Sequence, residues 1–563
     1  MYKQILDPIA DSLGWSALLA ALPLVLLFVL LGVFRVRAWA ASLLGLGAAI
    51  LVAAVGYGMP WGQVLLAGSE GAAFGLFPAM WIVANAIWVY EMTRRSGHFD
   101  VLKRSFSSIS PDRRIQGMII AFCFGALLEA LAGFGAPVAI CSVMLVALGL
   151  SPLKAATTAL VANTAPVAYG AVALPIITLA KVADLPTRDL AQMTGRQVPI
   201  LAVVVPFLLL FLLDGRRGLR QLWPAGLVCG LSFAIVQFAM ANYGPVQLSD
   251  IAASLVSAAA TLLFLRYWRT PEVLPVELDG DDAGAVPAGG TTPGAGSVGT
   301  LPRTRPSAAA RVAVQRDPAV EQLKAFAPYI VVVALFSIVA IPAVSEQLAR
   351  TTRIVQWPGL HLVNSAGKPL TLTSYKLDWL VGGGTVLLVS GLITAAILRL
   401  SPTVVLRCYG AVLRQVRAAG VTVMSVLALS YVMNASGMTV TMAAWLAGAG
   451  SAFAVLSPVL GWFGTAVTGS DTSSNSLFGA LQVQAAQRTG LDPVLLAAAN
   501  SSGGVLGKML SPQNLAIGAS AVGLSGREGE LFRRVLAATA ILLPLLCVVV
   551  VLQATSVLSW LVP

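Results

Sequence analysis

Three ionisable residues stand inside long apolar stretches of the sequence, where a charge is costly. Glu129 follows an uncharged apolar run, Asp471 lies in the motif TGSDTSSN, and Lys508 lies near the middle of the segment 493–522. Burial disfavours the ionised form of a carboxyl group, so Glu129 and Asp471 are candidates for taking up and releasing protons. The ammonium group of Lys508 needs an anion at this depth and is a candidate for binding a carboxylate.

Each of these residues also has an ordinary structural interpretation. Glu129 could be permanently hydrogen-bonded to backbone, and Asp471 could be the N-cap of a helix. Lys508 could form an internal ion pair with Asp471 or Glu129. The sequence leaves both interpretations open for all three residues.

Small polar residues and glycine gather around the same positions. Exposed N-termini of half-helices and short hydroxyl or amide side chains favour a carboxylate. Ordinary kinks of packed membrane helices are the alternative, because Gly and Pro are common there. The predicted substrate contacts are Gly135, Asn163, Thr164, Ser470, Thr472, Ser473, Asn500, Ser501, Ser502 and Lys508.

The elements that position these residues are membrane helices. Hydrophobic residues make up 57% of the 563 residues and charged residues 11%, with a mean hydropathy of +0.84, which leaves too little polar surface for a soluble globule. Apolar stretches of about 20 residues, enough to cross a bilayer, recur from 16–34 to 535–561. The alternating strands of a β-barrel are not visible. We therefore expect an all-α polytopic membrane protein with about twelve crossings.

Basic residues in short loops predict the topology. They account for the net charge of +12 as cytoplasmic anchors rather than as a nucleic-acid surface. The loops 56–71 and 243–250 carry no Lys or Arg and are placed outside, together with the amino terminus. No basic region precedes the first apolar stretch, so we expect it to stay as the first helix rather than to be a removed signal peptide. The clusters placed inside are Arg35, Arg37, Arg94, Arg95, Lys103, Arg104, Arg113, Arg114, Arg216, Arg217, Arg220, Arg399, Arg407, Arg414, Arg417, Arg533 and Arg534.

A re-entrant hairpin explains the glycine-rich stretch that follows Glu129. A hairpin at 115–150 that turns back at 133–137, followed by one broken crossing at 155–182, carries the chain from Arg114 inside to the next loop outside. Irregular backbone at membrane depth is tolerated where it is buried in protein or lines a cavity.

The segment 271–323 differs from the rest of the chain. It contains seven Pro, seven Gly and no aromatic residue, a composition that cannot bury enough apolar surface to fold. We expect a disordered cytoplasmic linker. It separates a first membrane repeat, 1–221, and a connecting helix pair, 222–266, from a second repeat, 324–563.

The second half repeats the order of motifs of the first. GFGAPVA at 133–139 is followed by NTAPVAYG at 163–170, and TGSDTSSN at 468–475 is followed by NSSGGVLGK at 500–508. Since the linker is inside, the second copy runs with the opposite orientation. Inverted repeats with broken helices that meet near the midplane point to the binding site of a secondary transporter.

The second repeat thus has its own predicted hairpin, about 450–487, and its own broken helix, about 493–522. The motifs GALLEALAGFGAPVAI, NTAPVAYGA, TGSDTSSNSLFGALQ and NSSGGVLGKMLSPQNLAIG resemble the lactate permease family, bacterial carriers that take up lactate or glycolate with protons. The resemblance covers nearly the whole chain except the linker, which is longer than in the family. It implies two hairpins and two unwound helices that hold a carboxylate, and a place in the bacterial plasma membrane.

These observations predict a transporter rather than an enzyme. Its expected cargo is a small 2-hydroxymonocarboxylate, namely L-lactate, D-lactate or glycolate. Such an anion is ionised at neutral pH, and its entry into a negative-inside cell costs about 2.3 kcal/mol per 100 mV, so a proton is expected to accompany it. Sodium coupling and a passive channel are the alternatives, and no Walker motif suggests an ATP-driven pump.

Few other partners are expected. The sequence predicts no cofactor, no metal and no nucleic acid; the partners are the substrate, protons, the lipid bilayer and a possible second copy of the chain.

Glu91 is expected to pair with Arg94 and Arg95, and His98 and His361 to have no chemical role. The five cysteines have no CxxC spacing and are expected to be free thiols: Cys123, Cys141, Cys229, Cys408 and Cys547.

Overall fold

The computed structural model confirms an all-α membrane architecture. It describes residues 2–563 except for Arg35, 108–109, Ala132, Phe134, 275–317, 364–368, 371–372 and 525–526. Within these ranges, ten helices are long and apolar enough to cross a membrane, by length and composition. One of them contains α12, which bends sharply at Asp214 and Gly215 and folds back on itself.

The first half of the chain contains thirteen α-helices in the part that the structure describes. They are α1 (Leu13–Gly32), α2 (Ala38–Leu51), α3 (Trp61–Phe74), α4 (Trp81–Arg95), α5 (His98–Ser107), α6 (Arg113–Met118), α7 (Gly125–Leu131), α8 (Ala136–Ala147), α9 (Pro152–Ala162), α10 (Gly170–Ala183), α11 (Thr187–Thr194), α12 (Val198–Tyr243) and α13 (Ser249–Tyr267). Shorter helical turns join them at η1 (Val52–Gly56), η2 (Gly75–Met80), η3 (Ile119–Phe124) and η4 (Val246–Leu248).

The second half begins with α14 and ends near the C-terminus with α23. Its α-helices are α14 (Ala319–Val339), α15 (Pro342–Ala349), α16 (Gly383–Ile397), α17 (Pro402–Ser436), α18 (Met438–Leu446), α19 (Phe453–Thr468), α20 (Asp471–Thr489), α21 (Pro493–Gly507), α22 (Pro512–Ala521) and α23 (Glu528–Gln553). The short turns are η6 (Ala447–Ala452), η7 (Lys508–Leu510) and η8 (Ser559–Leu561).

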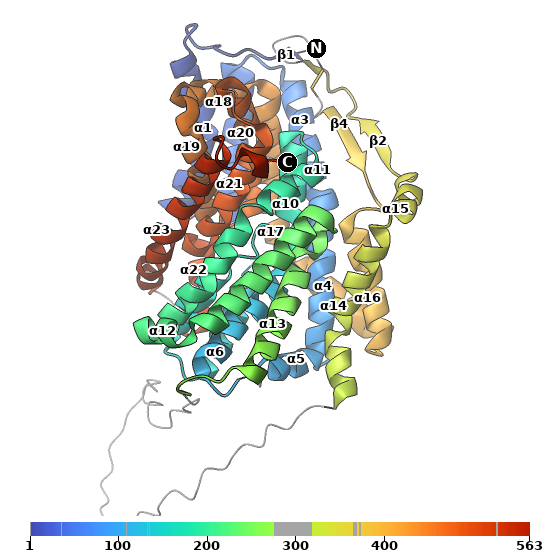
Figure 1. The fold of residues 1–563 in the computed structure, drawn as a ribbon. Coiled ribbons are helices and arrows are strands. Elements are labelled where there is room, and N and C mark those ends of the chain that lie inside the picture. Colours follow the sequence, from blue (N-terminus) through green and yellow to red (C-terminus); the bar gives the residue numbers. More distant parts are fainter. Residues whose placement is uncertain are drawn as a thin grey trace, which may run out of the picture.

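Two small sheets lie at the end of the bundle that carries the amino terminus (Figure 1). Strand β1 (Tyr2–Lys3) pairs in parallel with β3 (Leu362–Val363). Strand β2 (Arg353–Gln356) pairs antiparallel with β4 (Ser374–Leu377). Helices α5 and α6 lie at the opposite end (Figure 1). The predicted basic loops around them and the amino terminus are therefore on opposite ends of the molecule.

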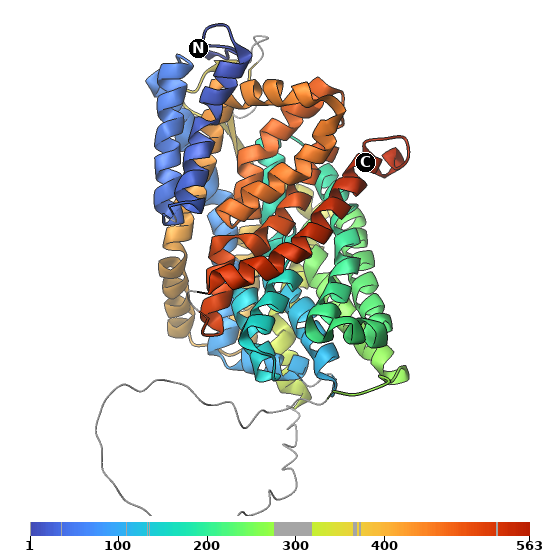
Figure 2. The same cartoon turned by 90° about the vertical axis from the view of Figure 1, so that its left-hand side faces the viewer.

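Helices from the two halves pack against each other throughout the bundle. Helix α17 packs on α2, α3 and α4, and α20 packs on α10. Helices α1 and α2 lie along one side, shown in blue in Figure 2. Buried apolar side chains from most of these helices form one continuous core.

A helix pair occupies each range in which a hairpin is expected. In the first half, the stretch from α6 to α7 packs on α8, and in the second half α19 packs on α20. Both connections need left-handed backbone, which Gly135 supplies with φ +80° and Gly469 with φ +79°. Glycine adopts this conformation without a steric penalty.

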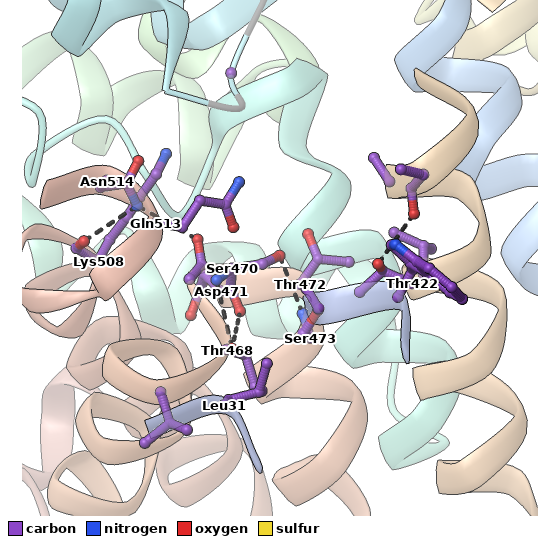
Figure 3. Close-up of a pocket in the computed structure, with 18 of the residues that line it drawn as sticks. Leu31, Thr422, Thr468, Ser470, Asp471, Thr472, Ser473, Lys508, Gln513 and Asn514 are labelled. Carbon is purple, nitrogen blue, oxygen red and sulfur yellow. Dashed lines mark hydrogen bonds between the residues drawn. The ribbon is translucent and has the colours of Figure 1, made fainter. Parts of the chain in front are cut away.

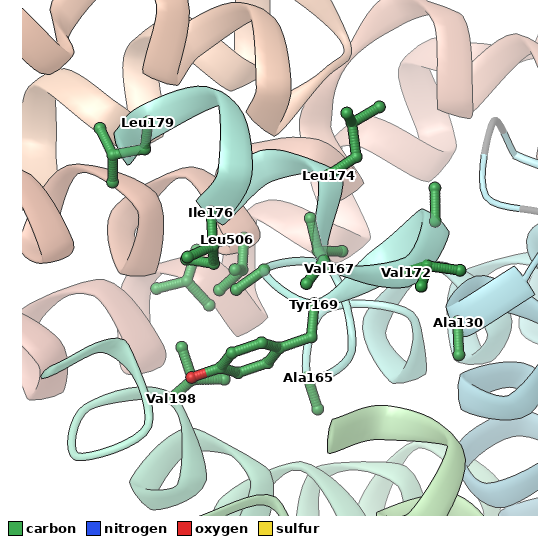
Figure 4. Close-up of a cluster of buried hydrophobic side chains, with 14 of the residues drawn as sticks. Ala130, Ala165, Val167, Tyr169, Val172, Leu174, Ile176, Leu179, Val198 and Leu506 are labelled. Atoms are coloured by element: carbon green, nitrogen blue, oxygen red, sulfur yellow. The ribbon is translucent and has the colours of Figure 1, made fainter. Parts of the chain in front are cut away.

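The first predicted break is present. Helix α9 ends at Ala162 and α10 begins at Gly170, with irregular backbone between them. Figure 4 shows how this stretch is held: Val167, Tyr169 and Val172 point into a cluster of apolar side chains that also contains Val198 and Leu506.

The second break is not where the sequence placed it. Helix α21 continues through Asn500 without interruption, and the break follows at Lys508–Ser511, before α22. Ser511 caps α22, because its hydroxyl accepts a hydrogen bond from the backbone N–H of Asn514 at 3.3 Å. Pro512 lacks a backbone N–H and suits the first position of this helix.

Two predicted boundaries also need correction. The stretch 56–71 is not all loop, since α3 begins at Trp61. Residues 319–323 do not belong to the linker, since α14 begins at Ala319. Most of the remaining linker, 275–317, lies outside the described residues. The stretch 56–71 was predicted to be an outside loop because it contains no Lys or Arg. A membrane helix also lacks these residues, so their absence does not distinguish a loop from a helix.

Candidate functional site

A cavity of about 940 Å³ opens between the two halves of the bundle. Its wall is formed by α7, the irregular stretch before α10, α17, the turn between α19 and α20, and the turn between α21 and α22. Figure 3 shows the polar side chains of 468–473 near those of Lys508, Gln513 and Asn514, with Thr422 of α17 on the opposite side. The polar and charged lining residues are Arg37, Glu129, Arg417, Thr422, Thr468, Ser470, Asp471, Thr472, Ser473, Lys508, Gln513 and Asn514.

An ion pair connects the two halves in the wall of this cavity. The Lys508 Nζ lies 2.5 Å from Glu129 Oε1, and the two side chains are only 8% and 4% exposed. The other oxygen of Glu129 accepts a hydrogen bond of 3.0 Å from Asn163 Nδ2. A Cβ at Gly170 would lie 2.9 Å from Glu129 Oε1, so the absence of a side chain there leaves room for the carboxylate.

The pair settles one alternative left open by the sequence. Lys508 has an internal carboxylate partner, and this partner is Glu129 rather than Asp471. The ordinary structural interpretation of Glu129 expected hydrogen bonds to the backbone. The carboxylate instead binds the side chains of Asn163 and Lys508. A lysine and a glutamate that separate elements bring together in a cavity wall can exchange partners with a bound anion.

Asp471 is held by uncharged donors. Its Oδ2 accepts hydrogen bonds from Ser501 Oγ at 2.8 Å and from Asn475 Nδ2 at 3.3 Å. Among the described residues no Lys, Arg or His lies within ion-pair distance of it. Asp471 is not the N-cap of α20, because Ser470 caps this helix by accepting from the Ser473 N–H at 3.3 Å.

A network of amide side chains lies behind Asp471. Asn500 Nδ2 donates to Asn475 Oδ1 at 2.9 Å, and Gln482 Nε2 donates to Asn500 Oδ1 at 3.1 Å. Ser502 points elsewhere and donates to Gln197 Oε1 at 2.7 Å. These side chains of α21 therefore bind neighbouring helices.

The glycines in the same part of α21 serve close helix packing. A Cβ at Gly503 would lie 1.9 Å from the carbonyl oxygen of Pro458, and one at Gly507 would lie 2.1 Å from that of Trp462. Both carbonyls belong to α19. Small residues at an interface let membrane helices approach this closely, which explains the glycines without a helix break.

Half of the predicted site residues line the cavity. These are Glu129, Ser470, Asp471, Thr472, Ser473 and Lys508. Six others lie outside its lining: Gly135, Asn163, Thr164, Asn500, Ser501 and Ser502. Asn163 and Ser501 nevertheless touch it indirectly, because each donates a hydrogen bond to a lining carboxylate.

Sequence comparison identifies the family. Residues 16–557 match the model of the family described as L-lactate permease. The chain is 38% identical to the L-lactate permease of Bacillus subtilis (strain 168), with 100% of each chain covered. The chain belongs to the L-lactate permease family.

Further relatives of this family member have related names. The glycolate permease GlcA of Escherichia coli (strain K12) is 39% identical, with 96% of each chain covered. Among solved structures, MtrF of Neisseria gonorrhoeae is similar with a TM-score of 0.44 and 14% identity, over 87% of this chain and 84% of that one. A permease is a transporter, and with its apolar helices this family member is a multi-pass membrane protein.

Several lining residues of this permease were not predicted. Gln513 and Asn514 follow Ser511 and Pro512, with which α22 begins. The Asn514 Nδ2 donates a hydrogen bond of 3.2 Å to the backbone carbonyl of Lys508. Two amide side chains, Gln513 and Asn514, so close to Lys508 in the motif KMLSPQN could have indicated that they belong to the site. Thr422 and Arg417 come from α17, whose sequence gives no sign that this helix meets the hairpins.

Two other predictions for this permease are confirmed. Glu91 pairs with Arg94 and Arg95 at 2.8 and 2.7 Å. All five cysteines are free thiols.

Proposed function

We propose that this protein carries L-lactate and related 2-hydroxymonocarboxylates, including D-lactate and glycolate, across the bacterial plasma membrane by proton symport. The relatives named as L-lactate and glycolate permeases support the class of substrate. The observation that supports proton coupling is the ion pair between Glu129 and Lys508 in the cavity wall.

Coupling follows from competition for one ammonium group. The Glu129 carboxylate is paired with the Lys508 ammonium. A proton on Glu129 removes its negative charge and releases the ammonium, which then binds the carboxylate of the substrate. Without that proton, two carboxylates would share one ammonium in a buried site, which is costly. Proton and substrate therefore bind together, and each raises the affinity for the other.

The charge balance of the wall is unchanged by loading. Ionised Glu129 and Lys508 sum to zero, and so do protonated Glu129, Lys508 and one bound monocarboxylate. A neutral loaded site can cross the membrane without the electrical cost that opposes a lone anion. One proton per substrate satisfies this balance.

The hydroxyl groups at the start of α20 suit the rest of the substrate. Ser470, Thr472 and Ser473 line the cavity beside Asp471. Their hydroxyls can donate to and accept from the 2-hydroxyl of the substrate. Asp471 is the second candidate for proton coupling, because it is buried without a cationic partner among the described residues.

The arrangement supports two inverted repeats. Each half supplies a helix pair and a break: α7 and α8 with the stretch before α10, and α19 and α20 with the stretch before α22. Glu129 and Lys508 join these two sets. Arg37 and Arg417 line the cavity and belong to clusters predicted inside, so this state faces the cytoplasm.

Uptake into proteoliposomes tests the proposal. Labelled L-lactate is offered with either a pH gradient, acidic outside, or a sodium gradient, each imposed alone. A proton symporter accumulates lactate under the pH gradient only. Accumulation under the sodium gradient only would establish sodium coupling, and equilibration without accumulation under both would establish a passive channel.

A further inference from the structure

A second buried carboxyl group lies behind the broken stretch of the first half, outside the cavity lining. Asp250, in the first turn of α13, is 1% exposed. It packs beside Gln237 of α12, which is also buried. From the sequence, Asp250 is expected in an outside loop and has no predicted role.

Gln237 links this carboxyl group to the helix break. Its Nε2 donates to the Ala165 carbonyl at 3.2 Å and to Asp250 Oδ1 at 2.8 Å. Ala165 lies two residues after Asn163, which holds Glu129. Figure 4 shows Ala165 and Tyr169 on the same irregular stretch.

The remaining side-chain oxygens of Asp250 and Gln237 have no hydrogen-bond partner among the residues that the structure describes. Within the described residues, neither Asp250 Oδ2 nor Gln237 Oε1 accepts a hydrogen bond, and both atoms are buried. A buried ionised carboxylate requires donors or a cation, and the side chain of Asp250 has a single hydrogen-bond donor in the part of the chain that the structure describes.

The groups that face Asp250 do not favour a negative charge. Helix α13 packs on α12, α7, η3 and η4. The ionisable groups that interact electrostatically with Asp250 are Glu129 and Tyr169. The other ionisable side chains of the elements packed on α13 are Cys123 of η3 and Asp214, Arg216, Arg217, Arg220, Cys229 and Tyr243 of α12. Among the described residues no Lys, Arg or His lies within ion-pair distance of Asp250. Ionised Glu129 would repel a second carboxylate.

We infer that Asp250 holds a proton in this state and is a second proton-binding residue of the transporter, joined through Gln237 to the break that positions Glu129. The inference rests on the proposed proton symport and adds a site to it. Ionised Glu129 and ionised Asp250 repel each other, so Asp250 keeps its proton while Glu129 is ionised in its pair with Lys508. A loaded site that stays neutral has both carboxyl groups protonated, so a proton that passes from Asp250 toward Glu129 is replaced on Asp250 from outside. Asp250 ends the stretch 243–250 that is predicted outside, whereas the cavity contains Arg37 and Arg417, which are predicted inside.

Asp250→Asn tests the inference. The amide has the same shape, keeps an oxygen for Gln237 and cannot ionise. We expect lactate–lactate exchange within about threefold of the original, while accumulation under a pH gradient falls to a ratio of about one. In the infrared spectrum at neutral pH, the variant should lose part of the C=O band of protonated carboxyl groups. Glu91→Gln is the matched control, because ionised Glu91 pairs with two arginines and contributes nothing to that band.

The possible results separate this inference from the proposed function. An Asp250→Asn variant that accumulates lactate normally and keeps the full band would overturn the inference alone. If the original protein fails to accumulate lactate under a pH gradient, proton symport fails, while the infrared band still reports on Asp250. A band that is absent at neutral pH, or that disappears when sodium is added, contradicts a bound proton. Should Asp250→Asn fold poorly, Gln237→Met is the second variant, because it keeps the Asp250 carboxyl group and removes the hydrogen bond to Ala165. Gln237→Met should retain the infrared band and lose lactate accumulation. Normal accumulation in this variant would refute the link.

Discussion

Lys508 Nζ lies 2.5 Å from Glu129 Oε1, although 379 residues separate them in the chain. The lysine comes from the break after α21 and the glutamate from α7, so the contact joins the two halves of the protein. It also makes the charge of each residue dependent on the other. This dependence leads to opposite expectations for the two single variants.

Glu129→Gln mimics the protonated state of Glu129 and leaves Lys508 free for the substrate. In the original protein, lactate affinity should rise as the pH falls, by up to about tenfold per pH unit where free Glu129 is ionised. The variant should bind lactate with a much weaker pH dependence. Lactate–lactate exchange should survive, and accumulation under a pH gradient should disappear.

Binding and transport measurements on purified, reconstituted protein check this expectation. Glu91→Gln serves as the control, since its carboxylate forms an ion pair outside the cavity lining. If Glu129→Gln still concentrates lactate against its gradient, Glu129 has a structural role and Asp471 becomes the leading proton carrier.

Lys508→Gln removes the ammonium that we expect to hold the substrate carboxylate. The single variant should lose most lactate affinity and also stability, because it leaves the Glu129 carboxylate buried without a cation, at a cost of about 3–5 kcal/mol. The double variant Glu129→Gln with Lys508→Gln should recover the stability and not the affinity. Thermal unfolding with and without lactate measures both quantities. Full lactate affinity in the double variant would exclude Lys508 as the substrate ligand.

The sequence predicted the helix break of the first half better than that of the second. Asn163 and Pro166 mark the first break correctly, because an amide and a proline within one apolar segment both disfavour a continuous helix. In the second half, Gly503 and Gly504 gave the same signal for a different reason. Gly503 allows α21 to approach α19, and Gly504 leaves room for the Asp471 carboxylate of α20. A single sequence does not distinguish a glycine at a break from a glycine at a close contact.

Side-chain direction was the other limit. Ser501 and Ser502 are neighbours on α21, yet one donates to Asp471 and the other to Gln197. Successive residues of a helix point about 100° apart, so only the packing of α21 decides which one faces the cavity wall. Asp250 was missed because the absence of Lys and Arg indicated a loop, while its burial depends on how α13 packs against α12 and against α7, which is far away in the sequence.

Shortening 280–315 to a flexible tether should leave transport per folded protein within about threefold of the original, because its composition predicts disorder. The described residues before this segment should stay in place. Arg114 Nη2 donates to the Glu272 carbonyl at 2.7 Å, and the Arg113 N–H donates to that of Leu274 at 3.0 Å. Uptake normalised to the amount of monodisperse protein is the measurement. Complete loss of transport in well-folded protein would reveal a gating element within the segment.

Gly504→Ala should disrupt the site without changing any polar group. A Cβ at this position would lie 1.9 Å from Asp471 Oδ1 and 2.8 Å from Thr465 Oγ1, so the carboxylate or α21 must move. Overpacking of this kind costs about 1–3 kcal/mol, and a displaced Asp471 should also weaken lactate binding. Gly410→Ala is the matched control, since it lies in α17 with open space around its Cβ, and alanine in a helix is favoured by about 0.5–1 kcal/mol. Thermal unfolding and lactate binding should therefore change in Gly504→Ala and be preserved in Gly410→Ala; unchanged binding and stability in both would show that α19 and α21 are less closely packed around Asp471.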